Sequence, residues 1–130
     1  MKTGTDNLPM PYTRSITFRI GMKAMGKARP RVCGRRAFMP KKYTDWKASF
    51  GRHALSIAGD RAIVGRFGIV GSIVTKSGKM RSDLDNSIGS ILDALQDVDI
   101  IGNDRDCVSI NMALEQGEDD QISFTLEAIK

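Results

Sequence analysis

Three aspartates, Asp83, Asp85 and Asp104, are spaced so that their carboxylates can share a cation. Asp83 and Asp85 are two residues apart and point the same way in an extended chain. They precede an apolar stripe of helical periodicity, which places them at the positive end of a helix dipole. Asp104 follows this helix and a short connection, and the next strand can return it to the first pair. Three carboxylates packed together repel one another unless a cation lies between them.

Magnesium is the cation that suits such ligands, with Mn²⁺ as a substitute. It takes oxygen ligands, keeps several waters and is commonly completed by substrate phosphates. An ion of this kind can activate water and stabilise the leaving oxygen in phosphodiester hydrolysis. The alternative is structural, because an aspartate at a helix start is a common cap and one in a loop is a common turn residue.

Basic residues gather upstream of the aspartates. The cluster consists of Lys27, Arg29, Arg31, Arg35, Arg36, Lys41, Lys42, Lys47 and Arg52. Lysine and arginine neutralise phosphates without reading sequence, and the interleaved Phe38, Tyr43 and Trp46 can stack on unpaired bases. The alternatives are a solvated loop for the arginines and core packing for Trp46.

Charge is divided unevenly along the chain. Residues 1–82 hold 18 of the 20 Lys and Arg residues and three acidic residues, a net charge of +15. Residues 83–130 hold two basic and 12 acidic residues, a net charge of −10. A basic portion points to a polyanionic partner, and an acidic portion joined to it can hold a cation against that polyanion. The alternative is that the two halves neutralise each other within the fold or across a dimer.

Other chemistries are not indicated by the sequence. His53 is the only histidine and has no partner at ligand spacing, so we interpret it as a surface or packing residue. Cys33 and Cys107 are far apart, which indicates reduced thiols in a cytoplasmic protein. No apolar run is long enough to cross a membrane. The sequence contains no Gly-rich phosphate loop, zinc motif or nucleophile elbow.

The length and composition fit one domain. The chain has 130 residues, of which 41% are hydrophobic, enough for a buried core within one domain spanning residues 1–130. We expect residues 1–14 to form a loose leader. Because a domain of this size is small, association into a dimer would add useful buried surface.

Hydrophobic periodicity predicts the elements of the N-terminal half. Alternating apolar residues predict a half-buried strand over residues 15–24. Residues 26–40 are rich in Gly, Pro and Arg and predict a loop or a short ribbon. Apolar residues at helical spacing predict a helix over residues 43–58, capped by Thr44 or Asp45.

The same reasoning predicts a strand, a helix and two further strands in the C-terminal half. Residues 66–75 are apolar on both faces, which is typical of a central strand. The stripe from Leu84 to Leu95 predicts the second helix. Residues 108–114 and 122–128 alternate around a polar turn and predict a hairpin. The whole order predicts an α+β domain with one mixed β-sheet, two main helices and a C-terminal β-hairpin.

Several segments occur together in a characteristic order. They are Gly26-Lys27-Ala28-Arg29-Pro30-Arg31, Met39-Pro40-Lys41-Lys42-Tyr43, Asp83-Leu84-Asp85-Asn86 with the Ile91-Leu92-Asp93-Ala94-Leu95 helix, and Ile101-Gly102-Asn103-Asp104-Arg105-Asp106. In content and order they resemble the RusA-like Holliday-junction resolvases, in particular the phage and prophage branch of that family. The match covers most of the chain, from about Ile16 to the end.

The resemblance implies a homodimeric endonuclease that binds branched DNA and uses Mg²⁺ to nick opposed strands. It places the metal carboxylates at Asp83, Asp85 and Asp104, with Asp106 as the nearest competitor for the last position. The chain departs from the family at Gly89, where a catalytic lysine usually stands four residues after the second aspartate. Either another cation substitutes, or turnover is slow. The nearest cations by sequence are Lys76, Lys79 and Arg81, and small Gly89 can also admit a lysine from elsewhere.

We therefore expect a Mg²⁺-dependent endonuclease that cuts four-way junctions or related branched DNA, without a small-molecule cofactor or a membrane partner. The alternatives are a non-catalytic or weakly active branched-DNA-binding protein on the same scaffold and a nuclease for flaps or forks. The residues expected to bind DNA are Lys27, Arg29, Arg31, Arg35, Arg36, Lys41, Lys42, Lys76, Lys79 and Arg81.

Overall fold

The computed structural model describes residues 13–29, 31–34 and 36–129. The elements are β1 (Ser15–Ile20), β2 (Arg31–Cys33), β3 (Arg36–Phe38), α1 (Lys41–Ala58), β4 (Phe67–Thr75), α2 (Leu84–Asp97), the short 3₁₀ helix η2 (Asp104–Asp106), β5 (Cys107–Gln116) and β6 (Gln121–Ala128). This confirms the α+β class with two main helices. Most of the expected leader, residues 1–12, lies outside the described part of the chain.

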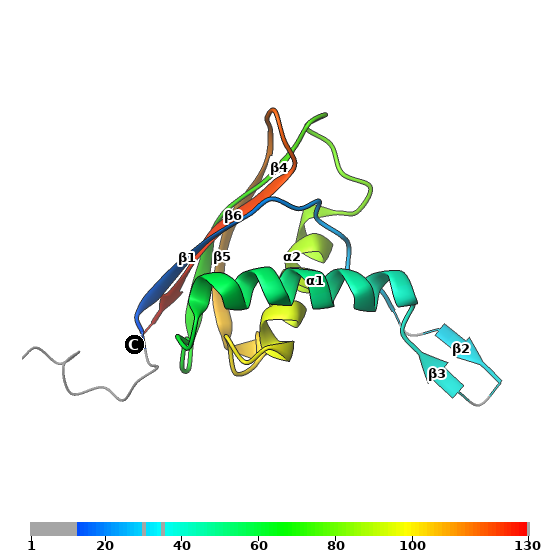
Figure 1. The fold of residues 1–130 in the computed structure, drawn as a ribbon, viewed down its shortest axis with the longest axis horizontal. Helices are drawn as coiled ribbons and strands as arrows, with labels where there is room; N and C mark the ends of the chain where they lie inside the picture. Colours follow the sequence, from blue (N-terminus) through cyan, green and yellow to red (C-terminus); the bar gives the residue numbers. More distant parts are fainter. Residues whose placement is uncertain (1–12, 30, 35, 130) are drawn as a thin grey trace, which may run out of the picture.

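One mixed sheet of four strands forms the body of the protein, in the order β1-β6-β4-β5. β6 runs antiparallel to both β1 and β4, whereas β5 runs parallel to β4. The placement of β4 between two partners confirms the central strand inferred from its apolar residues on both faces. Both helices lie on the same face of this sheet (Figure 1).

The predicted C-terminal hairpin is wrong, because β5 and β6 are not neighbours. β4 lies between them and bonds to both. The polar connection of residues 117–120 crosses the end of β4, where the Gly117 amide donates to the Thr75 carbonyl and the Lys76 amide donates to Asp120. Alternation within each strand identifies its buried face but not its partner.

Side chains from the sheet and both helices interlock in one core. Phe18 of β1 stacks on Phe124 of β6 at 4.8 Å between ring centroids, and Phe124 stacks on Phe50 of α1 at 6.3 Å. Trp46 stacks on Phe50 at 5.1 Å, and its indole N–H donates to the Lys23 carbonyl. Trp46 is only 8% exposed, so it belongs to the core and does not present a surface for stacking bases.

Helix α1 begins two residues earlier than its periodicity predicts. Pro40 is its N-cap and no side chain caps the helix, so the predicted caps Thr44 and Asp45 are wrong. Thr44 lies inside the first turns and its hydroxyl donates to the Lys41 carbonyl. The expected ribbon in residues 26–40 is present as the antiparallel pair β2–β3, which projects away from the body beyond the start of α1 (Figure 1).

Candidate metal and nucleic-acid site

Asp83 and Asp85 stand at the N-terminus of α2, as their spacing predicts. Asp83 occupies the N-cap position, yet its side chain makes no capping hydrogen bond. Asp85 is in the first turn, and its only side-chain hydrogen bond among the described residues accepts from the Asn86 amide at 2.9 Å. Both residues are exposed. The structural alternative of a helix cap therefore does not account for Asp83, whose carboxylate oxygens are open to a ligand.

Asp104 does not join this pair within one chain. Helix α2 runs back along the sheet from the end of β4, so it ends at the opposite end from Asp83 (Figure 1). The Asp104 amide donates to the Gln96 side chain at 2.9 Å, in the last turns of α2. A helix of this length rises roughly 20 Å, and Asp104 and its competitor Asp106 lie at its far end. The expectation that the next strand returns Asp104 to the pair is wrong, because β5 starts beside the beginning of β4.

Of the three aspartates expected to bind the metal, one chain therefore brings only Asp83 and Asp85 together. In the described ranges, no three His, Cys, Asp or Glu side chains come together in a group that could hold a metal ion. The Asp83–Asp85 pair remains, and Mg²⁺ is commonly bound by one or two carboxylates with waters and substrate phosphates completing its shell. The pair fits that mode of binding.

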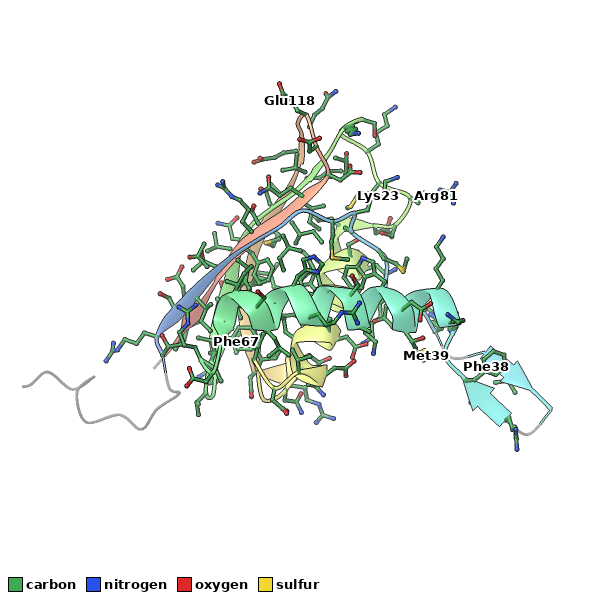
Figure 2. The ribbon with its side chains drawn as sticks, in the orientation of Figure 1. Lys23, Phe38, Met39, Phe67, Arg81 and Glu118 are labelled. Atoms are coloured by element: carbon green, nitrogen blue, oxygen red, sulfur yellow. The ribbon has the colours of Figure 1, made fainter. Side chains whose placement is uncertain are left out.

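A basic cavity is lined in part by the chain segment that leads into this pair, although Asp83 and Asp85 are not among its lining residues. Its volume is 760 Å³, and it opens between the segment after β1, the start of α1 and the loop after β4. Five cations line it, and Figure 2 shows Lys23 and Arg81 on the same side of the molecule. The lining residues are Lys23, Ala24, Met25, Gly26, Lys42, Trp46, Thr75, Lys76, Ser77, Lys79, Met80, Arg81, Ser82 and Asp120. The wall ends at Ser82, immediately before Asp83.

Thr75 contributes an unpaired polar atom to the wall of this cavity. The residue is 7% exposed, and its Oγ1 has no hydrogen-bond partner within the described residues. An unpaired buried hydroxyl costs about 1–3 kcal/mol. The oxygen itself is inaccessible to solvent, so this cost falls on the stability of the fold and the hydroxyl offers no binding group to the cavity.

The expected DNA-binding residues fall into separate groups. Lys42, Lys76, Lys79 and Arg81 line the cavity. Arg29 and Arg36 are exposed at the β2–β3 ribbon, while the Arg31 side chain and all of Arg35 lie outside the described part. Lys41 pairs with Asp45 at 2.6 Å on the surface of α1. Lys27 packs against α2. Sequence reasoning missed Lys23, whose alternating position in a strand pattern indicated only a solvent-facing residue.

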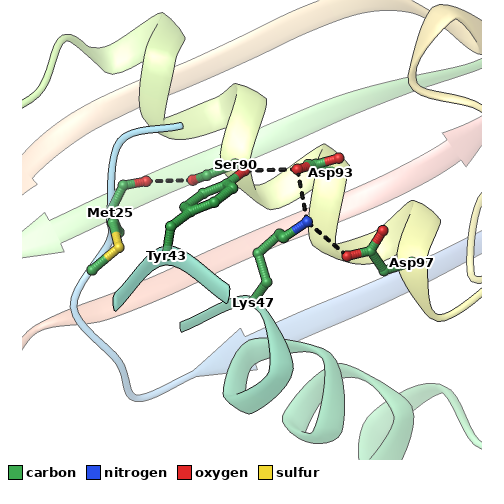
Figure 3. Close-up of polar contacts among 6 residues, drawn as sticks. All are labelled: Met25, Tyr43, Lys47, Ser90, Asp93 and Asp97. Atoms are coloured by element: carbon green, nitrogen blue, oxygen red, sulfur yellow. Dashed lines mark hydrogen bonds and ion pairs between the residues drawn. The ribbon is translucent and has the colours of Figure 1, made fainter. Parts of the chain in front are cut away.

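A polar network joins helix α1 to helix α2. The Tyr43 hydroxyl donates to Asp93 at 2.7 Å, and the Lys47 ammonium lies 3.1 Å from Asp93 and 2.9 Å from Asp97 (Figure 3). Burial alone would raise the pKa of Asp93, but the hydrogen bonds from Tyr43 and Lys47 outweigh it and lower that pKa. Burial also raises the pKa of Tyr43, and Asp93 raises it further. Lys47 therefore carries a structural role and is not free for DNA.

The lowered pKa of Asp93 predicts a pH-dependent contribution to stability. The contribution is present above the unfolded pKa of about 4 and is lost as the pH falls through the lower folded value. Asp93→Asn should lower the free energy of unfolding by about 1 kcal/mol at pH 7, and the difference from the unchanged protein should shrink below pH 4. Urea unfolding across this range measures it, with exposed Asp60→Asn as the control. A difference that stays constant with pH would contradict the network.

His53 is exposed, as expected of a surface residue, and its Nδ1 lies 2.8 Å from the Ser49 carbonyl oxygen. The Cys107 thiol is free. Among the described residues, no helix combines the length and the apolar character that a membrane crossing needs. Comparison of the chain with protein-family models gives no match, and comparison with curated proteins gives no significant match.

Proposed function

We propose that the protein is a Mg²⁺-dependent, structure-specific endonuclease that binds Holliday junctions or related branched DNA and nicks opposed strands. The observation that carries the proposal is the exposed Asp83–Asp85 pair, in which Asp83 makes no cap bond and which directly follows in sequence the Lys79–Ser82 wall of a cavity lined by five cations and Asp120. Cations neutralise the phosphates of a bound strand, and the carboxylates would hold an ion that activates a water for attack on one of those phosphates. The resemblance to RusA-like resolvases supports the choice of branched DNA.

The carboxylates and the cations of the site have different roles. An Mg²⁺ ion bound to Asp83 and Asp85 would supply an activated water and neutralise charge on the phosphate. Lys79 and Arg81 lie in the loop that leads directly into the carboxylates, so they hold the phosphate backbone closest to the cut. Lys23, Lys42 and Lys76 extend the same positive surface along the strand.

The β2–β3 ribbon supports binding at a branch point. It projects from the body and exposes two apolar side chains, Val32 and Phe38, beside Arg36. Figure 2 shows Phe38 on this ribbon, away from the core. Aromatic side chains stack on exposed base faces, and a branch point interrupts the stacking of base pairs where continuous duplex does not.

A role for Asp104 at the same ion requires a second copy of the chain. Asp104 lies at the far end of α2 from Asp83, so only another protomer can bring the two together. Strand β5 starts beside Asp104, forms one edge of the sheet and exposes Val108 and Ile110. An apolar strand edge of this kind is a template for pairing with another chain, which supports the proposed homodimer.

The test compares labelled four-way junction, flap, fork and linear duplex substrates, with and without Mg²⁺. Paired, symmetric nicks on the junction in Mg²⁺ are the expected result. Cutting confined to flaps or forks would instead identify a nuclease for those structures. Binding to junctions without any nick in Mg²⁺ or Mn²⁺ would refute the enzymatic proposal.

The second candidate function is a branched-DNA-binding protein without catalytic activity. The separation of Asp104 from Asp83 and Asp85 within one chain favours it, because an isolated chain holds only two of the three expected carboxylates together. This candidate requires the cavity and the ribbon but not the aspartates. Its signature is junction binding that is unaffected by neutralising the pair and by removing Mg²⁺.

Both candidates require the cations of the cavity. Lys79→Ala combined with Arg81→Ala should weaken junction binding by about tenfold or more, and the slope of log affinity against log salt should fall by about two. Fluorescence anisotropy at several salt concentrations measures both quantities. Arg14→Ala with Arg66→Ala removes the same charge at the opposite end of the sheet and should change neither. Equal effects of the two double variants would show that only overall charge matters.

A further inference from the structure

The segment that follows β1 is fixed onto the first turns of α2. The Ser90 hydroxyl donates to the Met25 carbonyl (Figure 3), and the Lys27 amide donates to the Asn86 carbonyl at 3.2 Å. Gly26 lies so close to α2 that an added Cβ would be 2.6 Å from Ser82 Cβ and 2.7 Å from Asn86 Nδ2. The backbone at Lys27 is therefore held beside the turn that carries Asp85.

The side chain of Lys27 lies over Gly89. A Cβ built on Gly89 would be 3.6 Å from Lys27 Cδ and 3.9 Å from Lys27 Cβ, which are ordinary contact distances. Gly89 is four residues after Asp85, so the two share a face of the helix with about 5–6 Å between adjacent positions. A Cβ would fit beside the lysine stem, so it is the absence of a longer side chain at Gly89 that leaves room for this stem, one turn from the carboxylate.

The ammonium of Lys27 is not held in an ion pair with any of the described residues, and the residue is exposed. Its charge helps to lower the pKa of Asp93, one turn beyond Gly89, and Asp93 is already paired with Lys47. The flexible four-carbon stem would have to turn from the Asp93 side of Gly89 toward Asp85 to present its point charge there.

We propose that Lys27 is a catalytic residue of this site, with its ammonium contacting the phosphate that is cut and Gly89 keeping its path open. The inference rests on the proposed nuclease function. In the reaction, a water oxygen bonds to phosphorus and one phosphate ester bond breaks. The two protons of the water pass to the released sugar oxygen and to solvent. The Lys27 ammonium offsets the negative charge that gathers on the phosphate oxygens during this exchange.

The decisive variant is Lys27→Met, which keeps an apolar stem over Gly89 and removes the charge. Single-turnover cutting of the junction in Mg²⁺ should fall by about a hundredfold or more, while junction affinity should fall no more than about fivefold. Thermal unfolding by circular dichroism confirms that the variant is folded. Lys27→Arg provides a second variant in which the charge is kept. Arg66→Ala is the control for loss of one positive charge far from the site.

A positional rescue separates catalysis from a structural role. In the Lys27→Ala background, Gly89→Lys should restore cutting by about tenfold or more, because the new side chain grows into the path that Lys27 leaves. Gly89→Leu in the same background fills the path without a charge and should not restore cutting. A structural role for Lys27 would be served by either replacement.

The outcomes distinguish this inference from the function on which it rests. If the unchanged protein cuts and Lys27→Met cuts at the same rate, Lys27 is not catalytic and the nuclease proposal stands. Equal losses in cutting and in affinity would make Lys27 a DNA-holding residue only, which also overturns the inference. If the unchanged protein never cuts any substrate, the nuclease proposal fails and the role of Lys27 fails with it.

Discussion

Replacing Asp85 with asparagine is expected to reduce Mg²⁺-dependent cutting of junction DNA by at least about a thousandfold. Asparagine keeps the size of the side chain and removes the charge that attracts the ion. Asp85 is exposed and its side chain bonds only to the neighbouring Asn86 amide among the described residues, so the fold should tolerate the change. Junction binding should be unchanged or tighter, because one negative charge no longer faces the phosphates.

The measurement is single-turnover cleavage beside binding under the same conditions. Asp60→Asn removes an exposed carboxylate after the end of α1 and serves as the control for loss of one negative charge. Asp83→Asn should reproduce the loss, because the two carboxylates act on one ion. A protein that cuts at its original rate with Asp85→Asn does not use this pair, and the metal site would have to lie elsewhere.

Mixing two inactive proteins is expected to restore cutting if Asp104 acts across a dimer. Asp85→Asn and Asp104→Asn should each be inactive alone. A dimer with one subunit of each kind has one site that carries both changes and one site with neither, because the two ends of α2 belong to different sites. Random exchange makes about half of all dimers mixed, so about a quarter of the sites should become active.

This result is specific to the geometry of α2. If Asp83, Asp85 and Asp104 of one subunit formed one site, each subunit of a mixed dimer would carry a damaged site and no activity would return. Co-expression of differently tagged chains and purification by both tags gives the mixed dimer, and the cut junction is the readout. Activity of Asp104→Asn alone at the original level would remove Asp104 from the site altogether. The pair Asp83–Asp85 would then be sufficient.

Sequence alone determined the parts of this protein that depend on short-range periodicity. The alternation of Ile16, Phe18 and Ile20 identified a strand with one buried face, and all three are buried. The apolar residues on both faces of β4 identified the central strand, although its second face is only partly covered and Val70 is 38% exposed. The position of Asp83 and Asp85 at a helix start followed from the stripe that begins at Leu84.

Tertiary structure decided everything that depends on which distant segments meet. The hairpin expected of β5 and β6 was wrong because strand order is set by long-range pairing with β4, which a period of two residues does not report. The expectation that Asp104 lies beside Asp83 and Asp85 was wrong for the same reason, because it also depends on how distant segments of the chain pack. A helix that connects two parallel strands must carry the chain back to the end of the sheet at which both strands begin. Its first and last residues therefore lie at opposite ends of the sheet and cannot contribute to one site in one chain.

The same long-range packing assembled the surface on which the proposals rest. Lys23 and Arg81 are distant in sequence and face one cavity because the segment after β1 passes beside the loop after β4. In the sequence, Gly89 stood out as a position without a lysine that could admit one from elsewhere, but the sequence did not show which lysine this would be. The fold lays Lys27 across it, because Gly26 lets the chain approach α2 closely enough for a side chain from another segment to occupy that path.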